Sequence, residues 1–232
     1  MKICLLDIGN STVLIAEANQ EGFLNKTWVS TTQFIDKFDA SFFMNFDSIL
    51  ASSVVPKIDL LFQNLPITFV TFDNVPKLIF NLSEPEQLGA DRVVNALGAL
   101  THYGPNCLII DSGTALTFCY VDHQSVYQGG IIFPGPTLAT LALYEHTAKI
   151  PLIYPGFVNK LLGKNTEEAV QIGSGLGYIH LINGFIADFR KTYPQVTVIG
   201  TGNGLASIQE HLYLDYHDSE LILKGLYASF PF

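Results

Sequence analysis

Two short segments of this chain combine a carboxylate, a glycine and hydroxyl side chains in the same order. The first is DIGNST, from Asp7 to Thr12, and the second is DSGTA, from Asp111 to Ala115. Each follows one apolar run and precedes another, which predicts a turn between two buried strands. Glycine lets backbone N–H groups approach an anion, hydroxyl groups add donors, and a carboxylate can hold a hydrated cation that bridges phosphates. The pair therefore favours phosphate binding over plain hairpin turns in which the carboxylates satisfy only local amides.

A third candidate lies between these turns, in the segment GADR from Gly89 to Arg92. The spacing of Val93, Val94 and Leu97 predicts a helix that begins here, so Asp91 falls in its first turn. There the carboxylate could act as a general base toward an acceptor hydroxyl. It could also do no more than complement the helix dipole, and the residue types alone leave both interpretations open.

Strands and helices alternate around these segments, which indicates an α/β protein. Each half opens with a strand, an Asp-x-Gly turn with hydroxyl residues and a second strand, so the chain contains an internal repeat. We expect the boundary between the halves near residues 104–106. The expected strands cover residues 2–9, 11–18, 22–30, 47–55, 67–72, 106–113, 114–122, 125–133 and 195–202. The expected helices cover residues 32–43, 58–65, 90–103, 136–150, 165–194, 205–212 and 219–230.

Composition limits the classes of partner. Hydrophobic residues make up 48% of the chain and charged residues 14%, and the formal net charge is -9. There is no cluster of Lys and Arg, so nucleic acid is not expected as a partner, and no run approaches the roughly 18 apolar residues of a membrane span. The apolar excess favours a large core and a buried subunit interface. The cysteines Cys4, Cys107 and Cys119 lie in apolar runs, which predicts buried thiols in a reducing compartment.

Taken in order along the chain, these motifs resemble those of type III pantothenate kinases, in the superfamily of acetate kinase, sugar kinases and actin. The two turns are similar to the phosphate motifs of that family, and GADR matches its substrate motif. GGIIFPG at residues 129–135 resembles its third-strand turn, and NTEEAVQIG at residues 165–173 resembles a further family segment. The resemblance covers nearly the whole chain. It implies two similar RNase H-like domains, residues 1–105 and 106–232, with a nucleotide cleft between them.

The resemblance also implies an activity, which is ATP-dependent phosphorylation of pantothenate to 4'-phosphopantothenate, the first step of coenzyme A biosynthesis. The implied cofactors are ATP, Mg²⁺ and a monovalent cation, K⁺ or NH₄⁺, and the implied state is a cytoplasmic homodimer. Thr114 would donate to the ATP phosphates. The first turn would bind them through Asp7, Ile8, Gly9, Asn10, Ser11, Thr12, Val13 and Leu14. Asp111 would hold the monovalent cation and Asp7 would lie near the divalent ion, although the residues alone do not separate these two roles.

On the acceptor side, the resemblance implies that Asp91 is the general base and that Arg92 pairs with the pantothenate carboxylate. The alternative for Arg92 is a solvated position on the helix surface. Gly89 and Ala90 would admit the substrate because they lack bulk. Thr166 would contact pantothenate, although it also begins a TEEA segment that resembles a capping box, so a helix cap is the alternative there.

Two positions depart from the family pattern. Ser11 stands where the family usually has threonine, which keeps the hydroxyl group. Leu82 stands where the family often has a tyrosine that contacts the substrate, so a kinase for another small hydroxylated acceptor stays open as an alternative. A non-catalytic nucleotide-binding regulator is a further alternative. The segment GTGNG, Gly200–Gly204, lacks the spacing of a dinucleotide-binding loop and is expected to form a turn near the nucleotide.

Overall fold

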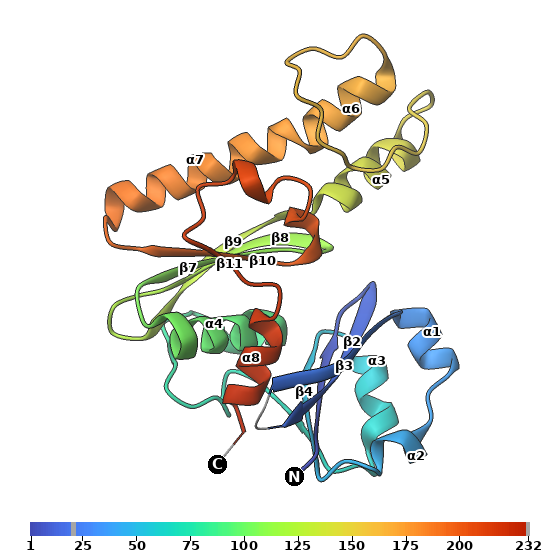
Figure 1. The fold of residues 1–232 in the computed structure, drawn as a ribbon, viewed down its shortest axis with the longest axis vertical. Coiled ribbons are helices and arrows are strands. Elements are labelled where there is room, and N and C mark those ends of the chain that lie inside the picture. The colour runs from blue at the N-terminus through green and yellow to red at the C-terminus, as the bar shows by residue number, and fades with distance from the viewer. Residues whose placement is uncertain (20–21, 231–232) are drawn as a thin grey trace. The chain divides into compact units, whose positions relative to one another are not determined.

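The computed structural model describes residues 1–19 and 22–230 of the chain (Figure 1). Within them the chain divides into two compact units. Unit 1 comprises Met1–Pro105, Val121–Gly129 and the chain from Glu220, and unit 2 comprises Asn106–Tyr120 and Gly130–Ser219. These units group residues by contact, and the division into repeated domains 1–105 and 106–232 stays a prediction.

Unit 1 is built on a mixed β-sheet. Its strands are β1 (Ile3–Ile8), β2 (Thr12–Asn19), β3 (Gly22–Ser30), β4 (Ser48–Ser53) and β5 (Ile67–Phe69). Their order is β3-β2-β1-β4-β5, with β1 antiparallel to β2 and parallel to β4. Almost every residue of β1 is buried, because helices cover both faces of this central strand.

The two faces of this sheet carry different helices. One face carries α1 (Thr31–Asp36), α2 (Ala40–Phe43), α3 (Pro56–Asp59) and the 3₁₀ turn η1 (Leu60–Phe62), and the other carries α4 (Ala90–Tyr103) and α8 (Leu221–Ala228). Phe34 and Phe43 pack with Leu6 and Ile8 on the first face. Leu5, of opposite parity along β1, packs with residues of α4 and α8 on the second face.

α4 and α8 pack at close range, side by side in Figure 1. A Cβ atom on Gly225 would lie 1.9 Å from the carbonyl oxygen of Val94, and one on Gly98 would lie 2.6 Å from that of Leu221. Backbone contact this close therefore needs glycine at both positions. The contact fixes the helix whose first turn contains Asp91.

A short strand ties the segment before α4 to the beginning of β9 (Val126–Pro134). This strand, β6 (Ile79–Phe80), is parallel to β9 and sets Phe80 opposite Tyr127. The ring centroids of Phe80 and Tyr127 are 5.7 Å apart, and the N–H of Asn81 donates to the carbonyl of Tyr127 at 3.0 Å. The 3₁₀ turn η2 (Pro85–Gln87) then leads into α4.

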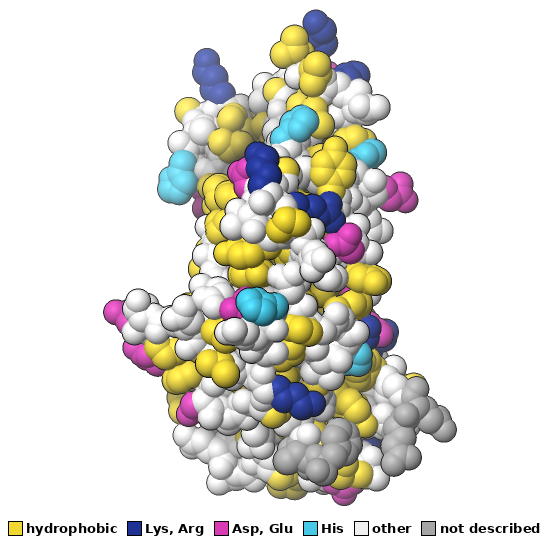
Figure 2. Space-filling model, turned by 90° about the vertical axis from the view of Figure 1, so that its left-hand side faces the viewer, with side chains coloured by type: hydrophobic (Ala, Val, Ile, Leu, Met, Phe, Trp, Pro, Cys, Tyr) yellow, Lys and Arg dark blue, Asp and Glu magenta, His cyan; other side chains and the backbone are white. Residues whose placement is uncertain are grey.

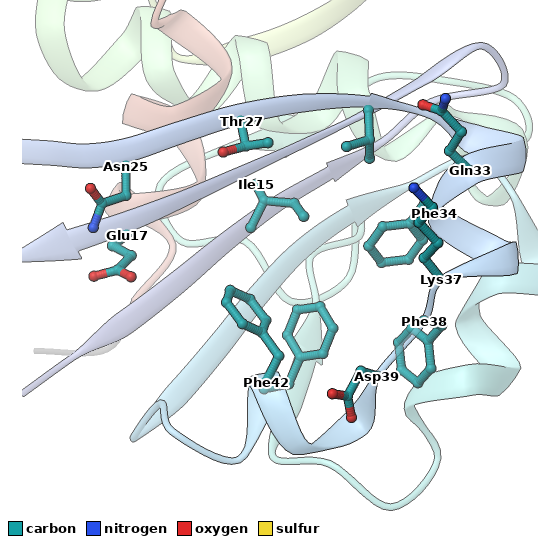
Figure 3. Close-up of a pocket in the computed structure, with 12 residues that line it drawn as sticks. Ile15, Glu17, Asn25, Thr27, Gln33, Phe34, Lys37, Phe38, Asp39 and Phe42 are labelled. Atoms are coloured by element: carbon teal, nitrogen blue, oxygen red, sulfur yellow. The ribbon is translucent and has the colours of Figure 1, made fainter.

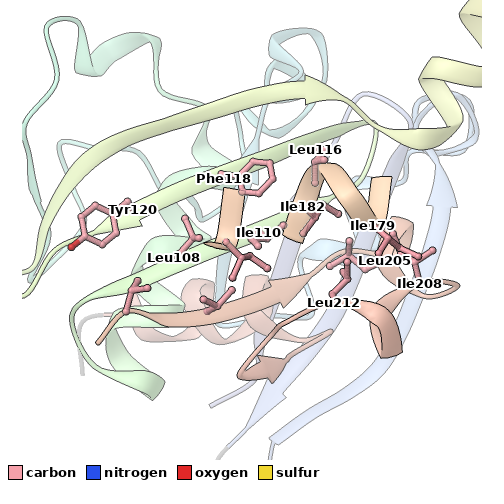
Figure 4. Close-up of a cluster of buried hydrophobic side chains, with 13 residues drawn as sticks. Leu108, Ile110, Leu116, Phe118, Tyr120, Ile179, Ile182, Leu205, Ile208 and Leu212 are labelled. Atoms are coloured by element: carbon pink, nitrogen blue, oxygen red, sulfur yellow. The ribbon is translucent and has the colours of Figure 1, made fainter. Parts of the chain in front are cut away.

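Unit 2 contains most of a second sheet. Its further strands are β7 (Cys107–Ser112), β8 (Ala115–Val121), β10 (Thr197–Thr201) and β11 (Tyr216–His217), in the order β11-β10-β7-β8-β9-β6. Its helices are α5 (Pro136–His146), α6 (Thr166–Ser174) and α7 (Leu176–Thr192). Ile179, Ile182 and Ile186 of α7 pack against sheet residues that include Leu108 and Phe118 (Figure 4).

Both sheets open with the same arrangement of strands. β1 continues through a tight turn into β2, and β7 continues through a tight turn into β8. Each first strand also has a parallel neighbour, in a register that sets Asp7 opposite Ser52 and Asp111 opposite Thr201. The expected α/β class is confirmed, and the repeat seen in the sequence corresponds to this shared strand arrangement.

The structure differs from expectation at residues 205–212, where a helix was predicted. Leu205, Ile208 and Leu212 are buried, as their helical spacing requires. The backbone instead forms two 3₁₀ turns, η3 (Asn203–Leu205) and η4 (Gln209–His211). A segment this short gains few helical hydrogen bonds against the cost of nucleation, so the packing of these three side chains decides its conformation.

The prediction that the thiols are buried is confirmed, since Cys4, Cys107 and Cys119 are all buried. No helix among the described residues is long and apolar enough to cross a membrane. On the face shown in Figure 2, the described Lys and Arg side chains lie scattered among apolar and uncharged ones.

Candidate functional site

The first turn joins β1 to β2 and is braced from outside by Thr31. The N–H of Gly9 donates to the carbonyl of Thr12 at 2.9 Å. Thr31 donates its N–H to the carbonyl of Ser11 at 3.0 Å and its hydroxyl to the carbonyl of Gly9 at 2.7 Å. With these carbonyl groups occupied, the exposed side chains of Asn10, Ser11 and Thr12 line the outer surface of the turn. Thr31 gives no recognisable signal in the sequence, because it reaches the turn only through the pairing of β2 with β3.

Asp7 and the GADR segment lie at the same end and on the same face of the unit 1 sheet. Asp7 pairs with Leu14 across β1 and β2, and Leu14 packs on the face that α4 and α8 cover. The N–H of Val54, just past β4, donates to the carbonyl of Ile8. A Cβ atom on Gly89 would lie 3.6 Å from Val54 Cγ1, so α4 begins beside this end of the sheet.

Asp91 has a partly buried carboxylate that folds back onto its own helix start. Its Oδ1 accepts a hydrogen bond from the N–H of Arg92 at 2.8 Å. Burial raises the pKa of Asp91 above its ordinary value, although the N–H and the charge of Arg92 act in the lowering direction. A Cβ atom on Gly89 would lie 2.5 Å from Oδ1, which explains glycine at that position. The carboxylate is thus a stronger proton acceptor than an exposed aspartate.

Arg92 lies near an aromatic ring that the sequence gave no reason to select. Its guanidinium carbon is 6.0 Å from the ring centroid of Tyr127, which is fully buried at the start of β9. Leu82 is adjacent to β9 as well, since a Cβ atom on Gly129 would lie 3.7 Å from Leu82 Cδ2. The pairing of β6 with β9 brings the segment around Leu82 to the start of β9. These two segments are far apart in the sequence, so no local pattern could have selected Tyr127.

The second turn, in unit 2, lies against a glycine at the end of β9. The N–H of Gly135 donates to the carbonyl of Thr114 at 2.8 Å, and a Cβ atom on Gly135 would lie 2.2 Å from the carbonyl oxygen of Gly113. Tyr178 of α7 donates its hydroxyl to the carbonyl of Pro134 at 2.8 Å, which fixes the strand end from behind. Gly113 and Thr114 remain exposed.

The segment GTGNG packs directly on the carboxylate of the second turn. Gly202 has φ +87°, and a Cβ atom there would lie 2.4 Å from Asp111 Oδ1. A Cβ atom on Gly204 would lie 2.3 Å from the hydroxyl oxygen of Ser112. That hydroxyl is buried and has no hydrogen-bond partner in the described part of the chain. Carboxylate, hydroxyl and carbonyl oxygens gathered at one turn form a donor set of the kind that binds hard cations.

Thr166 is the first residue of α6 but does not cap the helix. The cap is Asn165, whose side chain accepts from the N–H of Glu168 at 2.8 Å. The Glu168 carboxylate accepts in turn from the N–H of Lys164 at 2.9 Å. The alternative interpretation of Thr166 as a cap is therefore wrong, and its side chain is exposed at the helix start.

A cavity of about 610 Å³ in unit 1 lies apart from these residues (Figure 3). Strands β2 and β3 form one wall and helices α1 and α2 form the other, with Ile15 and Phe34 among its lining residues. Both side chains belong to the sheet face opposite Asp7. The cavity contains no residue that the sequence selected.

Solved structures define the class of this fold. A protein described as a Baf family transcriptional activator from Campylobacter jejuni is 18% identical, with a TM-score of 0.66 over 97% of this chain and 96% of that chain. A protein described as a 2-dehydro-3-deoxygalactonokinase from Sinorhizobium meliloti is 14% identical, with a TM-score of 0.59 over 98% and 95%. The chain has the α/β fold of actin-like ATPases and sugar kinases.

Sequence comparison then identifies the family. The model of type III pantothenate kinase matches residues 3–188. A relative from an Exiguobacterium species, named type III pantothenate kinase, is 31% identical over 97% of this chain and 96% of its own length. The chain belongs to the type III pantothenate kinase family.

The contact between Gly202 and Asp111 yields a prediction. In the variant Gly202→Ala the new Cβ would displace the Asp111 carboxylate, so we expect ATP to bind about 10-fold more weakly by calorimetry. Gly104→Ala is the matched control, because Gly104 has φ +86° but a Cβ there would meet no described atom within 4 Å. We expect it to lower the melting temperature and leave ATP affinity unchanged. Equal ATP affinities in the two variants would contradict the prediction.

Proposed function

We propose that this chain transfers the γ-phosphoryl group of ATP to the primary hydroxyl of pantothenate, forming 4'-phosphopantothenate in the first step of coenzyme A biosynthesis. Family membership supports this reaction. The observation that carries the proposal is the position of Asp91. This carboxylate with a raised pKa lies in the first turn of α4, on the face and at the end of the sheet where Asp7 and the first turn lie.

We assign ATP binding to both turns, that is to residues 7–14 of unit 1 and to Thr114 of unit 2. Phosphoryl transfer depends mainly on positioning the phosphates and neutralising their charge. Exposed hydroxyl groups and the backbone N–H groups of a tight glycine turn can position the phosphates. Asp7, at the strand end beside exposed hydroxyls, has the oxygen chemistry that suits hydrated Mg²⁺. When bound, Mg²⁺ would supply the charge neutralisation.

The acceptor side has a separate role for each residue. Asp91 takes the proton of the pantothenate hydroxyl as the phosphoryl group arrives. The guanidinium group of Arg92 pairs with the pantothenate carboxylate. Gly89 and Ala90 leave room for the acceptor, and Thr166 contacts pantothenate from the exposed start of α6.

A monovalent cation, K⁺ or NH₄⁺, is assigned to Asp111. The buried Ser112 hydroxyl without a partner in the described residues supports this, as does the close contact of the loop at Gly202 with the Asp111 carboxylate. Both features describe a turn whose oxygen atoms are packed closely by the loop at Gly202.

We further propose that the chain works as a homodimer in the cytoplasm. Unit 2 exposes large apolar side chains between β9 and α6, where Tyr154, Leu161 and Leu162 are 70%, 82% and 76% exposed. A second copy of the chain would remove this apolar surface from water. The segment leads directly into α6 and Thr166, so the same contact would bear on the acceptor pocket. Three buried cysteines that form no disulfide with one another support a reducing compartment.

The reaction is tested by mass spectrometry of the product formed from pantothenate, ATP and Mg²⁺, with and without K⁺. We expect a phosphorylated product whose formation depends on K⁺, and we expect Asp111→Asn to weaken that dependence. If ATP binds but no phosphopantothenate forms, the proposal fails, and another acceptor or a regulatory role takes its place.

The variant Asp91→Asn tests the base. We expect turnover to fall about 10²–10⁴-fold while ATP binding is kept. Because the pKa of Asp91 is raised on folding, the folded protein binds this proton more tightly than the unfolded chain, and the carboxylate lowers stability as pH rises through that interval. The variant removes this cost, so its melting temperature at neutral pH should equal or exceed that of the parent protein.

Asp122→Asn is the control for that experiment. Asp122 accepts backbone hydrogen bonds from Gln124 and Val126 at 2.8 and 3.0 Å in the turn between β8 and β9. We expect this variant to keep its turnover. Full activity in Asp91→Asn would remove Asp91 from the mechanism.

The dimer is tested by the double variant Leu161→Glu with Leu162→Glu, measured by light scattering. We expect the parent protein at twice the chain mass of 25.5 kDa and the variant at the single mass, because charged groups do not tolerate burial in an apolar contact. Tyr213→Glu changes another exposed side chain of unit 2 and should remain a dimer. A parent protein of single chain mass would refute the proposal.

A further inference from the structure

Ser52 is a buried serine whose hydroxyl group lacks a partner. It lies in β4 and is 0% exposed, and its Oγ atom makes no hydrogen bond within the described residues. A buried hydroxyl without a protein partner costs free energy unless something else satisfies it. Buried hydroxyl groups in folded proteins usually have a hydrogen-bond partner, so the presence of a serine at this position needs an explanation.

The next residue shows that the strand itself does not force this loss. Ser53 donates its hydroxyl to Asp59 Oδ1 at 2.5 Å and accepts from the N–H of Val55 at 3.2 Å. Successive side chains of a strand point to opposite faces. Ser53 therefore lies on the face of α3, and Ser52 lies on the face of α4.

Ser52 lies beside the carboxylate of the first turn. The parallel register of β1 and β4 pairs it with Asp7, and paired residues of adjacent strands point to the same face. Val54, two residues further along, contacts the start of α4, where a Cβ atom on Gly89 would lie 3.6 Å from Val54 Cγ1. Ser52 therefore lies in a strand that runs beside Asp7 and ends near the start of α4.

Unit 2 repeats this relation independently. The parallel register of β7 and β10 pairs Asp111 with Thr201, which is 4% exposed. Each aspartate proposed to act on a cation therefore has a buried hydroxyl residue opposite it on the neighbouring parallel strand. Apolar residues would pack at least as well at such positions, so the repeated hydroxyl points to a shared use.

We propose that the Ser52 hydroxyl is a positioning group of the phosphate site. It donates its hydrogen bond to a water molecule that contacts Asp7 and belongs to the hydration shell of the divalent ion bound with the nucleotide. The proposal rests on the nucleotide and Mg²⁺ binding assigned to Asp7 under the proposed function, and it is independent of which acceptor is phosphorylated. Binding of ion and nucleotide then gives the Ser52 hydroxyl a partner that the described residues do not supply.

If the Ser52 hydroxyl serves a ligand, its removal should weaken ligand binding without lowering the stability of the free protein. A serine that serves the fold stabilises the free protein, so its removal lowers the melting temperature. An unpartnered serine kept for a ligand destabilises the free protein, so its removal leaves the melting temperature equal or higher and weakens the binding of that ligand.

The experiment compares Ser52→Ala with Ser53→Ala. The melting temperature is measured without ligand, and Mn²⁺, which paramagnetic resonance detects directly, is titrated in the presence of a non-hydrolysable ATP analogue. We expect Ser52→Ala to keep or raise the melting temperature and to bind Mn²⁺ about 3- to 10-fold more weakly. Ser53→Ala should lower the melting temperature, because it breaks the bonds to Asp59 and Val55, and should bind Mn²⁺ as the parent protein does.

Unchanged Mn²⁺ affinity in Ser52→Ala would overturn the proposal, and so would a loss of melting temperature like that of Ser53→Ala. Neither measurement uses pantothenate. A failure of the proposed reaction therefore appears as a missing product in the parent protein, whereas a failure of this inference appears in the Mn²⁺ titration.

Discussion

The site depends on the pairing of a central strand with neighbours on both sides. β1 is bound antiparallel to β2 and parallel to β4, and β7 has the parallel neighbour β10. Asp7 and Asp111 stand near the ends of these strands, where the backbone is still held by the sheet and the following turn is exposed. A carboxylate in this position is held on a backbone that the sheet fixes. Every role proposed for the two turns depends on this pairing of strands.

Close backbone approach is the second requirement, and glycine meets it at the positions that matter. Gly89 leaves space for the Asp91 carboxylate, Gly135 for the second turn, and Gly202 for Asp111. At each of them a Cβ atom would occupy the space of a functional oxygen or of the turn that supports it. The glycines therefore contribute by lacking a side chain. This outweighs the larger loss of conformational entropy that glycine undergoes on folding.

The acceptor side depends on contacts that no local motif describes. Burial at the start of α4 raises the pKa of Asp91, and the pairing of β6 with β9 brings Tyr127 to Arg92. The apolar side chain of Leu82, just past β6, lies against β9. Strand pairing therefore shapes the surroundings of the GADR segment.

Most strands and helices and the residue types of the motifs could be predicted from the sequence, because apolar periodicity, glycine turns and carboxylates are local features. It indicated the repeat, the turns at Asp7 and Asp111 and the helix that begins just after Gly89. Only the tertiary structure decided that Thr31 braces the first turn and that Ser52 lies opposite Asp7. It also decided that residues 205–212 form 3₁₀ turns. Strand register and burial bring together residues that are distant in the sequence, and local sequence patterns contain no signal for such pairs.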